Sequence, residues 1–203
     1  MLPMSLKQRF RGFLPVVLDL ETGGFDAKSN AILEIAAVFI GYDEKDETLK
    51  IVDQWQQAVA PRPGSRIEEA SLKITGIDPG RPALSEAAAM RELFGLVRTA
   101  QKQAECGRSV MVAHNAAFDM GFMNAAIDRH QLKRSPFHPF TFIDTASLAA
   151  VGVGHTVLRE ACERAGIEFD NDQAHNALYD AQRTAELFCW MVNRWDERYA
   201  PLW

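Results

Sequence analysis

The sequence predicts a single α/β domain in which a mixed sheet of five strands carries helices on both faces. The chain has 203 residues, of which 47% are hydrophobic, so it is long enough for one well-filled core and short for two. Its first three apolar runs are joined by short connections, which indicates antiparallel strands. Later apolar runs alternate with stretches of helical period, and this change of pattern predicts a mixed sheet with helices packed on it.

Three strands are expected in the first third of the sequence. The first is the apolar run that begins at Val16 and ends in two acidic residues and two glycines. The second, at 32–40, is almost continuously apolar, which suits a strand covered on both faces. Glu34 interrupts this run, and we expect its carboxylate to accept a structural hydrogen bond rather than to act in catalysis. The third strand is expected at 49–59, where polar and apolar residues alternate.

The rest of the chain alternates helices with two more strands. Ser85 is a plausible N-cap for a helix whose apolar residues keep a helical period to about Glu105. Short strands are expected at 109–113 and 141–145, and Asp144 is expected to cap the helix after the last strand rather than to bind metal. A loop rich in proline and aromatic residues is expected at 135–140. The other helices are expected at 67–74, 117–130, 157–165 and around 181–195.

Composition and charge argue against several classes of protein. No apolar run reaches the roughly 20 residues of a membrane span, and the first 13 residues lack the apolar core of a signal peptide, so we expect a cytoplasmic protein. The cysteines form no CxxC pair, which argues against a zinc site or a disulfide framework. The net charge of −5 argues against a uniformly positive surface, although basic residues gather near the N-terminus and between 129 and 143.

Two acidic residues close the first strand. Asp19 and Glu21 are two positions apart, and because side chains alternate along a strand, both carboxylates point to the same face. Like charges on a core strand repel and are costly to desolvate, so they need a cation, and paired hard oxygens suit Mg²⁺ or Mn²⁺. The pair alone leaves an alternative open, in which Asp19 starts a turn and Glu21 is an exposed strand end.

Two later stretches decide between these interpretations. HNAAFD at 114–119 follows a core strand, and HNALYD at 175–180 opens the last helix. With the DLET of the first strand, they resemble in content and order the DEDD superfamily of 3′→5′ exonucleases, which has a ribonuclease H-like fold. We expect His114 and Asn115 to shape the loop before the second acid. The resemblance implies a histidine position at His175 and four metal-binding carboxylates: Asp19, Glu21, Asp119 and Asp180.

The chemistry of such an enzyme explains these residue types. Phosphodiester hydrolysis needs a deprotonated water on one side of phosphorus and a stabilised leaving oxygen on the other, which two divalent ions about 3.5–4 Å apart can supply. Four carboxylates offset the charge of two Mg²⁺ ions, with Mn²⁺ as an alternative. His175 is the candidate general base, because imidazoles ordinarily titrate near neutral pH. The alternative is a packed histidine at the start of a helix.

The residues before the last acid indicate the histidine branch of the superfamily. The other branch has a tyrosine four residues before that acid, where this chain has Asn176. Segments 9–13, 111–119, 132–140 and 173–188 resemble the ribonuclease T family, and the similarity extends over about 9–195. It implies a homodimeric 3′→5′ exoribonuclease that trims single-stranded 3′ ends of tRNA and other stable RNAs such as rRNA, also cuts single-stranded DNA, and releases nucleoside 5′-monophosphates. Basic residues of one subunit would deliver substrate to the active site of the other.

The resemblance also assigns substrate-binding positions. Basic residues would contact phosphates without reading sequence, namely Arg9, Arg11, Lys102, Arg108 and Lys133. Aromatic residues would stack on the terminal bases, namely Phe25, Phe118 and Phe140. The alternative for each is a solvated surface cation or an ordinary core aromatic. One position departs from the family, since Ile74 stands where relatives can carry another stacking phenylalanine, and this puts the base preference at the 3′ end in doubt.

Other functions on the same fold remain open at this point. A proofreading DNA exonuclease, such as the ε-type subunit of a polymerase, or an oligoribonuclease would share the catalytic residues. The family segments at 9–13 and 133–140 favour ribonuclease T over both. A non-catalytic nucleic-acid-binding module would not need all five catalytic positions, and in this sequence all five are filled.

Overall fold

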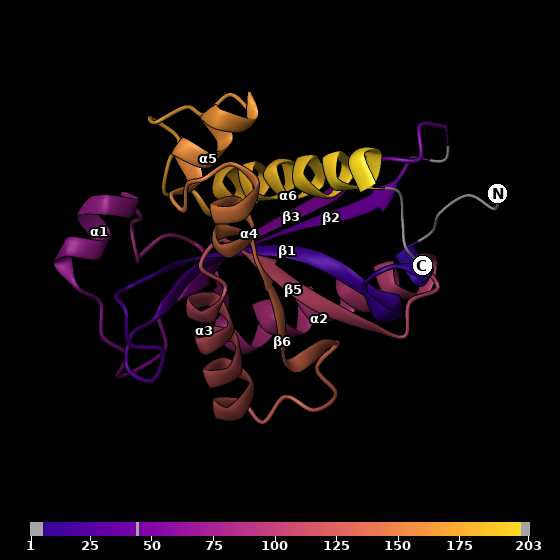
Figure 1. Cartoon of the computed structure of the whole chain (residues 1–203). Helices are drawn as coiled ribbons and strands as arrows, with labels where there is room; N and C mark the ends of the chain where they lie inside the picture. Colours follow the sequence, from indigo (N-terminus) through magenta and orange to yellow (C-terminus); the bar gives the residue numbers. More distant parts are fainter. Residues whose placement is uncertain (1–5, 44, 200–203) are drawn as a thin grey trace.

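The architecture is a six-stranded mixed sheet between two layers of helices (Figure 1). The structure is a computed structural model that describes residues 6–43 and 45–199. The strands lie in the order β4-β3-β2-β1-β5-β6. Their bounds are β1 Phe13–Thr22, β2 Ile32–Tyr42, β3 Leu49–Ala60, β4 Leu84–Ser85, β5 Arg108–Ala113 and β6 Phe137–Asp144.

β1 is the central strand of the sheet. It pairs antiparallel with β2 and parallel with β5, so that Val17 lies opposite Val38 on one side and Val112 on the other. The side chains of all three valines are completely buried. β2 in turn pairs antiparallel with β3, and β5 pairs parallel with β6. A strand with partners on both edges and helices on both faces is a rigid support for the acids at its carboxyl end.

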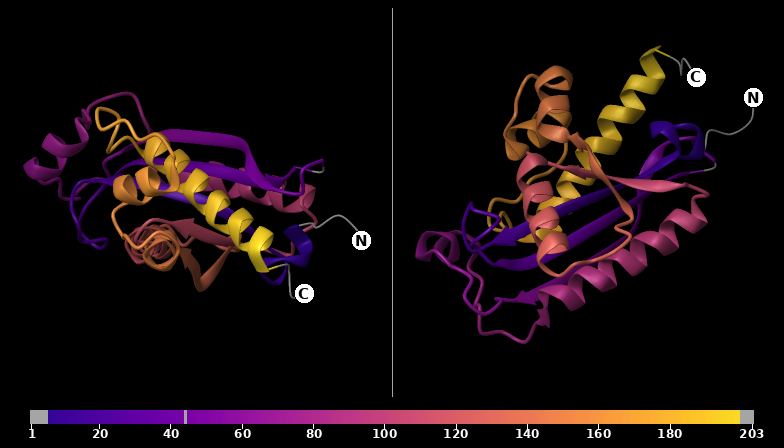
Figure 2. Two further views of the ribbon diagram at one scale, coloured as in Figure 1. Left: turned by 45° about the horizontal axis from the view of Figure 1, so that its top comes forward. Right: turned by 90° about the horizontal axis from the view of Figure 1, so that it is seen from below.

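Helices cover both faces of the sheet (Figure 2). The long α6 crosses one face, over β1, β2 and β3, with α4 and α5 beside it, whereas α2 and α3 lie on the opposite face (Figure 1). α1 instead projects from the end of the sheet at which β1 finishes (Figure 1). The helices span α1 Glu69–Thr75, α2 Glu86–Gln103, α3 Ala117–Arg129, α4 Thr145–Gly152, α5 Leu158–Ala165 and α6 Ala177–Tyr199, preceded by two 3-10 turns, Leu6–Gln8 and Phe10–Gly12.

The predicted elements are present, with three differences. The five expected strands are confirmed, and the structure adds β4, which has only two residues and therefore no periodic pattern in the sequence. The loop expected at 135–140 is wrong in part, because β6 begins at Phe137 and runs through its proline as an edge strand. α1 begins two residues later than expected. Ser85 caps α2, with its side chain accepting a hydrogen bond from the Ala88 N–H.

The structure does not describe the two ends of the chain, residues 1–5 and 200–203. The first five residues, on which part of the expectation about a signal peptide rests, lie outside the described residues. Within residues 6–43 and 45–199, no helix combines the length and apolar character that crossing a lipid bilayer requires.

Candidate active site

The carboxyl end of β1 carries the first two acids of the site. Asp19 is half-buried and Glu21 is buried, two residues apart on the same strand. Glu21 lies directly opposite Glu34 of β2 in the antiparallel register, and the register shifts immediately afterwards, between Glu21 and Thr22. This irregularity ends the regular pairing and allows the chain to turn away at Gly23 and Gly24.

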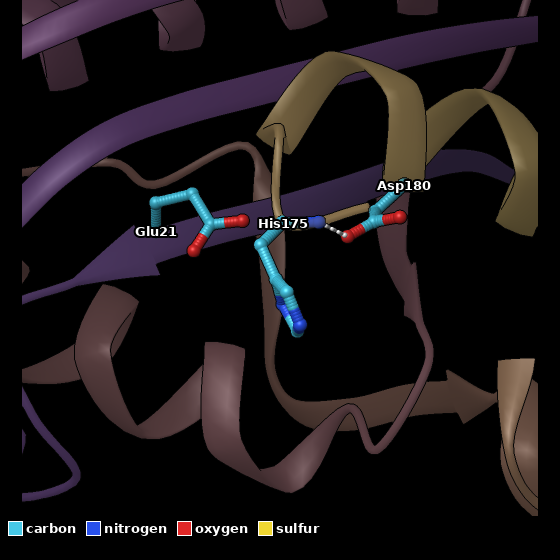
Figure 3. A group of neighbouring side chains, drawn as sticks. All are labelled: Glu21, His175 and Asp180. Atoms are coloured by element: carbon cyan, nitrogen blue, oxygen red, sulfur yellow. Dashed lines mark hydrogen bonds between the residues drawn. The ribbon is translucent and has the colours of Figure 1, made fainter. Parts of the chain in front are cut away.

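The start of α6 supplies the histidine and the last acid (Figure 3). Asn176 caps the helix, because its side-chain oxygen accepts a hydrogen bond from the Tyr179 N–H at 3.1 Å. His175, just before this cap, has a left-handed backbone with φ of 65°, and its N–H donates to Oδ2 of Asp180 at 2.9 Å. The imidazole is exposed and lies between Glu21 and Asp180 (Figure 3). The helix start therefore fixes the position of both functional side chains.

The start of α3 supplies the third segment. Asp119 lies in the first turn of this helix and is 4% exposed. Asp144 holds the preceding loop, because its Oδ1 accepts hydrogen bonds from the N–H groups of Asn115 and Ala116 at 2.9 and 3.1 Å. Its Oδ2 accepts from the Ser147 N–H, so the same carboxylate caps α4. The predicted capping role of Asp144 is confirmed.

His114 also shapes this loop, as predicted. One ring nitrogen lies 3.0 Å from the Thr145 hydroxyl and the other 2.7 Å from the Thr156 carbonyl oxygen. Burial lowers the pKa of His114 below its usual value, which favours the neutral ring. Asn115, with φ of 67°, makes the turn into α3. These two residues orient the helix that carries Asp119 and do not themselves join the acid cluster.

The acids act on one another electrostatically. Burial, then the charges of Asp119, Glu21 and Asp180, raise the pKa of Asp19 well above its ordinary value. Burial and the charge of Asp180 raise the pKa of Glu21 to about 8. Burial raises the pKa of Asp119 to about 7 and that of Asp180 above its ordinary value. Such shifts mean that the ionised cluster is destabilised unless a cation accompanies it.

The donor set fits a divalent metal ion. One ligand atom each of Glu21, His175 and Asp180 lies within 4.8 Å of the other two. Among the residues that the structure describes, Oδ1 of Asp180 is buried without a hydrogen-bond donor, so this oxygen is free to coordinate. Asp19 and Asp119 stand outside this closest group but interact with it through their charges. Hard carboxylate oxygens with one imidazole suit Mg²⁺ or Mn²⁺.

A fifth acid, Glu34, lies at the edge of the cluster. It is 4% exposed, and its Oε1 accepts a hydrogen bond from Nη2 of Arg81 at 2.7 Å. The prediction of a structural hydrogen bond for Glu34 is therefore confirmed. Its charge also contributes to the raised pKa of Glu21. Arg81 could not be predicted from the sequence, because a single arginine in a Gly-Arg-Pro turn carries no pattern that relates it to β2.

Two of the three predicted stacking residues lie together near the acids. Phe25 follows the turn after β1 and is 81% exposed, an unusual state for a large apolar ring. Its ring meets that of Phe118, next to Asp119, edge to face at 6.2 Å. Phe140 is 78% exposed but stacks on His138 and, through it, lies near Phe13 at the opposite end of β1.

The predicted basic residues lie at that opposite end. Phe13 pairs with Arg108 in the β1–β5 register, six residues before Asp19, and at 3.3 Å per residue the separation is about 20 Å. Arg11 lies over the Phe13 ring, and Arg108 and Lys133 are exposed. Lys102 is exposed in the last turn of α2, whose end meets Gly12. Arg9 is buried in an ion pair with Asp196.

Comparisons with known proteins bear on this geometry. A family profile described as an exonuclease, RNase_T, matches residues 16–188. The protein named Ribonuclease T from Shewanella frigidimarina is 53% identical over 194 residues, covering 94% of this chain and 87% of that protein. The one from Shewanella denitrificans is 51% identical over 195 residues, covering 94% and 85%.

Solved structures share the fold at lower identity. A full-length 3′-exonuclease superposes with a TM-score of 0.71 over 90% of this chain and 62% of that one, at 19% identity. E. coli Exonuclease I in complex with a dT13 oligonucleotide gives 0.69 over 91% and 42%, at 17% identity. The nuclease domain of 3′hExo, a DEDDh family member bound to rAMP, gives 0.65 over 91% and 92%, at 16% identity. The mixed sheet with its helices is thus the ribonuclease H-like fold of these exonucleases.

Proposed function

Because this chain belongs to the exonuclease family of ribonuclease T, whose profile spans residues 16–188, we propose a substrate and a mechanism for it from the geometry of its site. It is a 3′→5′ exonuclease. Its substrate is proposed to be the single-stranded 3′ end of tRNA and of other stable RNAs such as rRNA, with single-stranded DNA as a second substrate. Nucleoside 5′-monophosphates are the proposed products. The observation that carries the proposal is the convergence of Glu21, His175 and Asp180.

Four carboxylates are proposed to hold two Mg²⁺ ions, with Mn²⁺ as an alternative. Glu21 and Asp180 present ligand atoms to the same space, and the free, buried Oδ1 of Asp180 supports coordination there. Asp19 and Asp119 are proposed to complete the set, because burial raises the pKa of both carboxyls and a nearby cation would stabilise their ionised forms. When bound, the ions supply acidified water and stabilise charge on the phosphate and the leaving oxygen.

His175 is proposed to act as the general base. Its imidazole is exposed and lies within 4.8 Å of the ligand atoms of Glu21 and Asp180, so a water molecule between them and the substrate is within its reach. The hydrogen bond from its own N–H to Asp180 holds the backbone while the ring stays free to accept a proton. A packed histidine at a helix start, the alternative interpretation, would be buried, and His175 is not.

The two aromatic rings beside the acids are proposed to hold the last bases. Phe25 and Phe118 meet edge to face, and the larger part of Phe25 is exposed, so a base can stack on it beside the site. Stacking of this kind contributes about 1–3 kcal/mol per base and depends only weakly on sequence. A single strand is required, because paired bases cannot separate to reach these rings.

A homodimer is proposed to complete the substrate path. The exposed basic residues and Phe140 lie about 20 Å from Asp19 along the sheet, at the other end of β1, so within one subunit they do not flank the acids. In a two-fold dimer the basic end of one subunit can face the acidic end of the other, and the phosphates of the substrate then cross from one to the other. Arg11, Arg108, Lys102 and Lys133 are proposed as these phosphate contacts, and Phe140 as a base-stacking residue of the same surface. Arg9 is buried in its ion pair with Asp196, so it is proposed to support this surface by holding the neighbouring Arg11 in place.

Cleavage of three substrates tests the proposed activity. A tRNA with its single-stranded 3′ end, a dinucleotide and a duplex DNA with a mismatched 3′ end are compared at equal concentration in Mg²⁺. We expect the tRNA end to be shortened fastest, with 5′-monophosphates as products. A preference for the dinucleotide would identify an oligoribonuclease, and a preference for the mismatched duplex a proofreading enzyme. Binding of all three without cleavage would identify a non-catalytic module.

A further inference from the structure

α1 is attached to the protein in an unusual way. None of its seven residues, all of which the structure describes, is fully buried. The helix projects beyond the sheet at the catalytic end of β1 (Figures 1 and 2). A short helix that buries no side chain gains little stability from packing, so its position depends on the connections at its two ends.

The amino-terminal connection joins α1 to the turn after β1. The N–H of Glu68, the residue before α1, donates to the Gly23 carbonyl oxygen at 2.7 Å. The approach is so close that a Cβ atom at Gly24 would lie 2.4 Å from both the Glu68 and the Asn30 side chains. The next residue along the turn is Phe25. This end of α1 is therefore fixed beside the exposed ring at the site.

The carboxyl-terminal connection depends on Arg81. α1 ends at Gly76, and the loop that follows is held by local bonds, such as the Gly80 N–H to Asp78 Oδ1. Within residues 69–83, all of them described, Arg81 alone makes a hydrogen bond or ion pair to another element. Its Nη2 donates to Oε1 of Glu34 at 2.7 Å and to the Leu33 carbonyl oxygen at 3.2 Å.

Glu34, which accepts this hydrogen bond, lies next to the proposed metal ligands. Glu34 is the cross-strand neighbour of Glu21, and only 6% of its side chain is exposed, so it cannot swing toward solvent with Arg81. The Arg81 side chain is 31% exposed, which places the ion pair at the boundary between the core and the solvent-facing loop. A partly buried, charge-assisted hydrogen bond is stronger than an exposed one and holds a defined geometry.

We propose that Arg81 is a positioning residue that tethers α1 to β2 through Glu34 and so holds the helix over the substrate's terminal nucleotides. The claim rests on the proposed function for the identity of the substrate. α1 presents Ile74, 56% exposed, at the same end of the molecule as Phe25. With both ends fixed, α1 keeps Ile74 at the end of the molecule where Phe25 is exposed beside the acids (Figure 1). Without Arg81, the loop after α1, which the structure describes in full, has no hydrogen bond or ion pair to any element other than α1 until β4, where Leu84 pairs with Val59 of β3.

The test is the variant Arg81→Gln, assayed for kinetics on a short single-stranded RNA and for trypsin cleavage after Lys73. Lys73 lies within α1, and its side chain is 73% exposed, so the rate of cleavage after it reports how often α1 unfolds locally when it is not held in place. We expect KM to rise about tenfold, because α1 is held less often in the position that binds substrate. We expect kcat to stay within about twofold of the wild-type value. Cleavage after Lys73 accelerates by a similar factor, and the calorimetric affinity for Mg²⁺ alone stays within about twofold.

Matched variants separate the tether from other effects. Arg81→Lys keeps the charge and one donor and restores part of the KM, whereas Arg194→Gln, an equal loss of charge on an exposed residue near the far end of α6, leaves both measurements unchanged. Unchanged KM and unchanged cleavage in Arg81→Gln would overturn the proposal, and so would faster cleavage with an unchanged KM. An inactive wild-type enzyme would instead overturn the proposed function, while the cleavage at Lys73 would still test the tether.

Discussion

At the scale of single residues, the site depends on acidic side chains that are buried or partly buried. Asp180 illustrates this, because one carboxylate oxygen holds the His175 backbone and the other is buried without a donor. The four acids lie on three elements, β1, α3 and α6, and the loss of one carboxylate removes a proposed metal ligand but little packed volume. Function and stability are therefore separable at these positions.

Asp180→Asn tests that separation. Asparagine keeps an oxygen that accepts the hydrogen bond from the His175 N–H but removes the charge, so we expect exonuclease activity to disappear while the metal-free protein unfolds at an equal or higher temperature. Asp19→Ala is expected to behave in the same way. Circular dichroism melting and an RNA shortening assay measure the two effects. Turnover in either variant would contradict the assignment of the acids.

Metal binding is expected to release protons at neutral pH. Burial and neighbouring charges raise the pKa of Glu21 to about 8, and burial raises that of Asp119 to about 7. A raised pKa means that the folded, metal-free protein holds these protons more tightly than the unfolded chain does. The contribution of these two groups to the free energy of unfolding therefore increases as the pH falls from about 8 toward the ordinary pKa of a carboxyl group. This stabilising contribution is lost as the pH rises through the raised pKa values of Glu21 and Asp119.

Calorimetry measures this linkage directly. Because Mg²⁺ displaces the protons, its affinity rises between about pH 6 and pH 8, and titrations at pH 7 in two buffers of different ionisation enthalpy give different apparent heats. Glu21→Gln is expected to release fewer protons than the wild type. Equal heats in both buffers would show that the cluster is already ionised without metal.

At the scale of elements, three segment starts or ends converge on one site. The end of β1 and the first turns of α3 and α6 come from distant parts of the sequence, and each is fixed by its own local device: a shift of strand register, the Asp144 carboxylate and the Asn176 cap. Side-chain hydrogen bonds fix the starts of α3 and α6, because a small rotation of a helix start would displace the functional groups that it carries.

Asn176→Ala tests the contribution of the α6 cap. Loss of the hydrogen bond to the Tyr179 N–H is expected to destabilise the protein by about 1 kcal/mol, and kcat falls as well, because the neighbouring His175 loses its fixed backbone. Asn176→Ser provides another capping side chain and restores both. Denaturant unfolding and steady-state kinetics give the two readings. A loss of stability with unchanged kcat would mean that His175 is positioned by other contacts.

At the scale of the whole molecule, acids and bases occupy opposite ends of the central strand. The net charge of −5 therefore conceals a separation of about 20 Å between the cluster at Asp19 and the basic surface at Arg108. In a single subunit, this separation places the proposed catalytic groups and the proposed phosphate contacts too far apart for a short 3′ end. The proposed two-fold dimer would remove this difficulty, because the basic end of each subunit would face the acidic end of its partner.

Mixing two inactive variants tests the delivery of substrate between subunits. Asp180→Asn lacks one acid of the site but keeps the basic surface. The double variant Arg108→Ala, Lys133→Ala lacks part of the basic surface but keeps all four acids. After subunit exchange we expect about a quarter of wild-type activity, because half of the dimers are mixed and each has one complete path. The double variant alone should also show a shallower dependence of binding on salt, by about one unit of slope per lost contact. An inactive mixture would contradict the proposed dimer.

Local pattern in the sequence predicted most of the elements, and the resemblance of three motifs to an exonuclease family gave the four acids of the candidate site. Strand alternation placed Asp19 and Glu21 on one face, apolar runs marked five of the six strands, and the capping roles of Ser85 and Asp144 followed from their residue types. These features depend on neighbours within a few positions, which a sequence displays directly.

Only the tertiary structure decided which distant groups meet. It paired Glu34 with Arg81, buried Arg9 against Asp196, and separated Phe140 from Phe25 and Phe118 by the length of a strand. The edge strand β4 exists only because β3 is there to pair with it. The physical reason is the same in each case: long-range ion pairs and strand partners arise from the packing of whole elements, and the residues involved carry no periodic or motif pattern of their own.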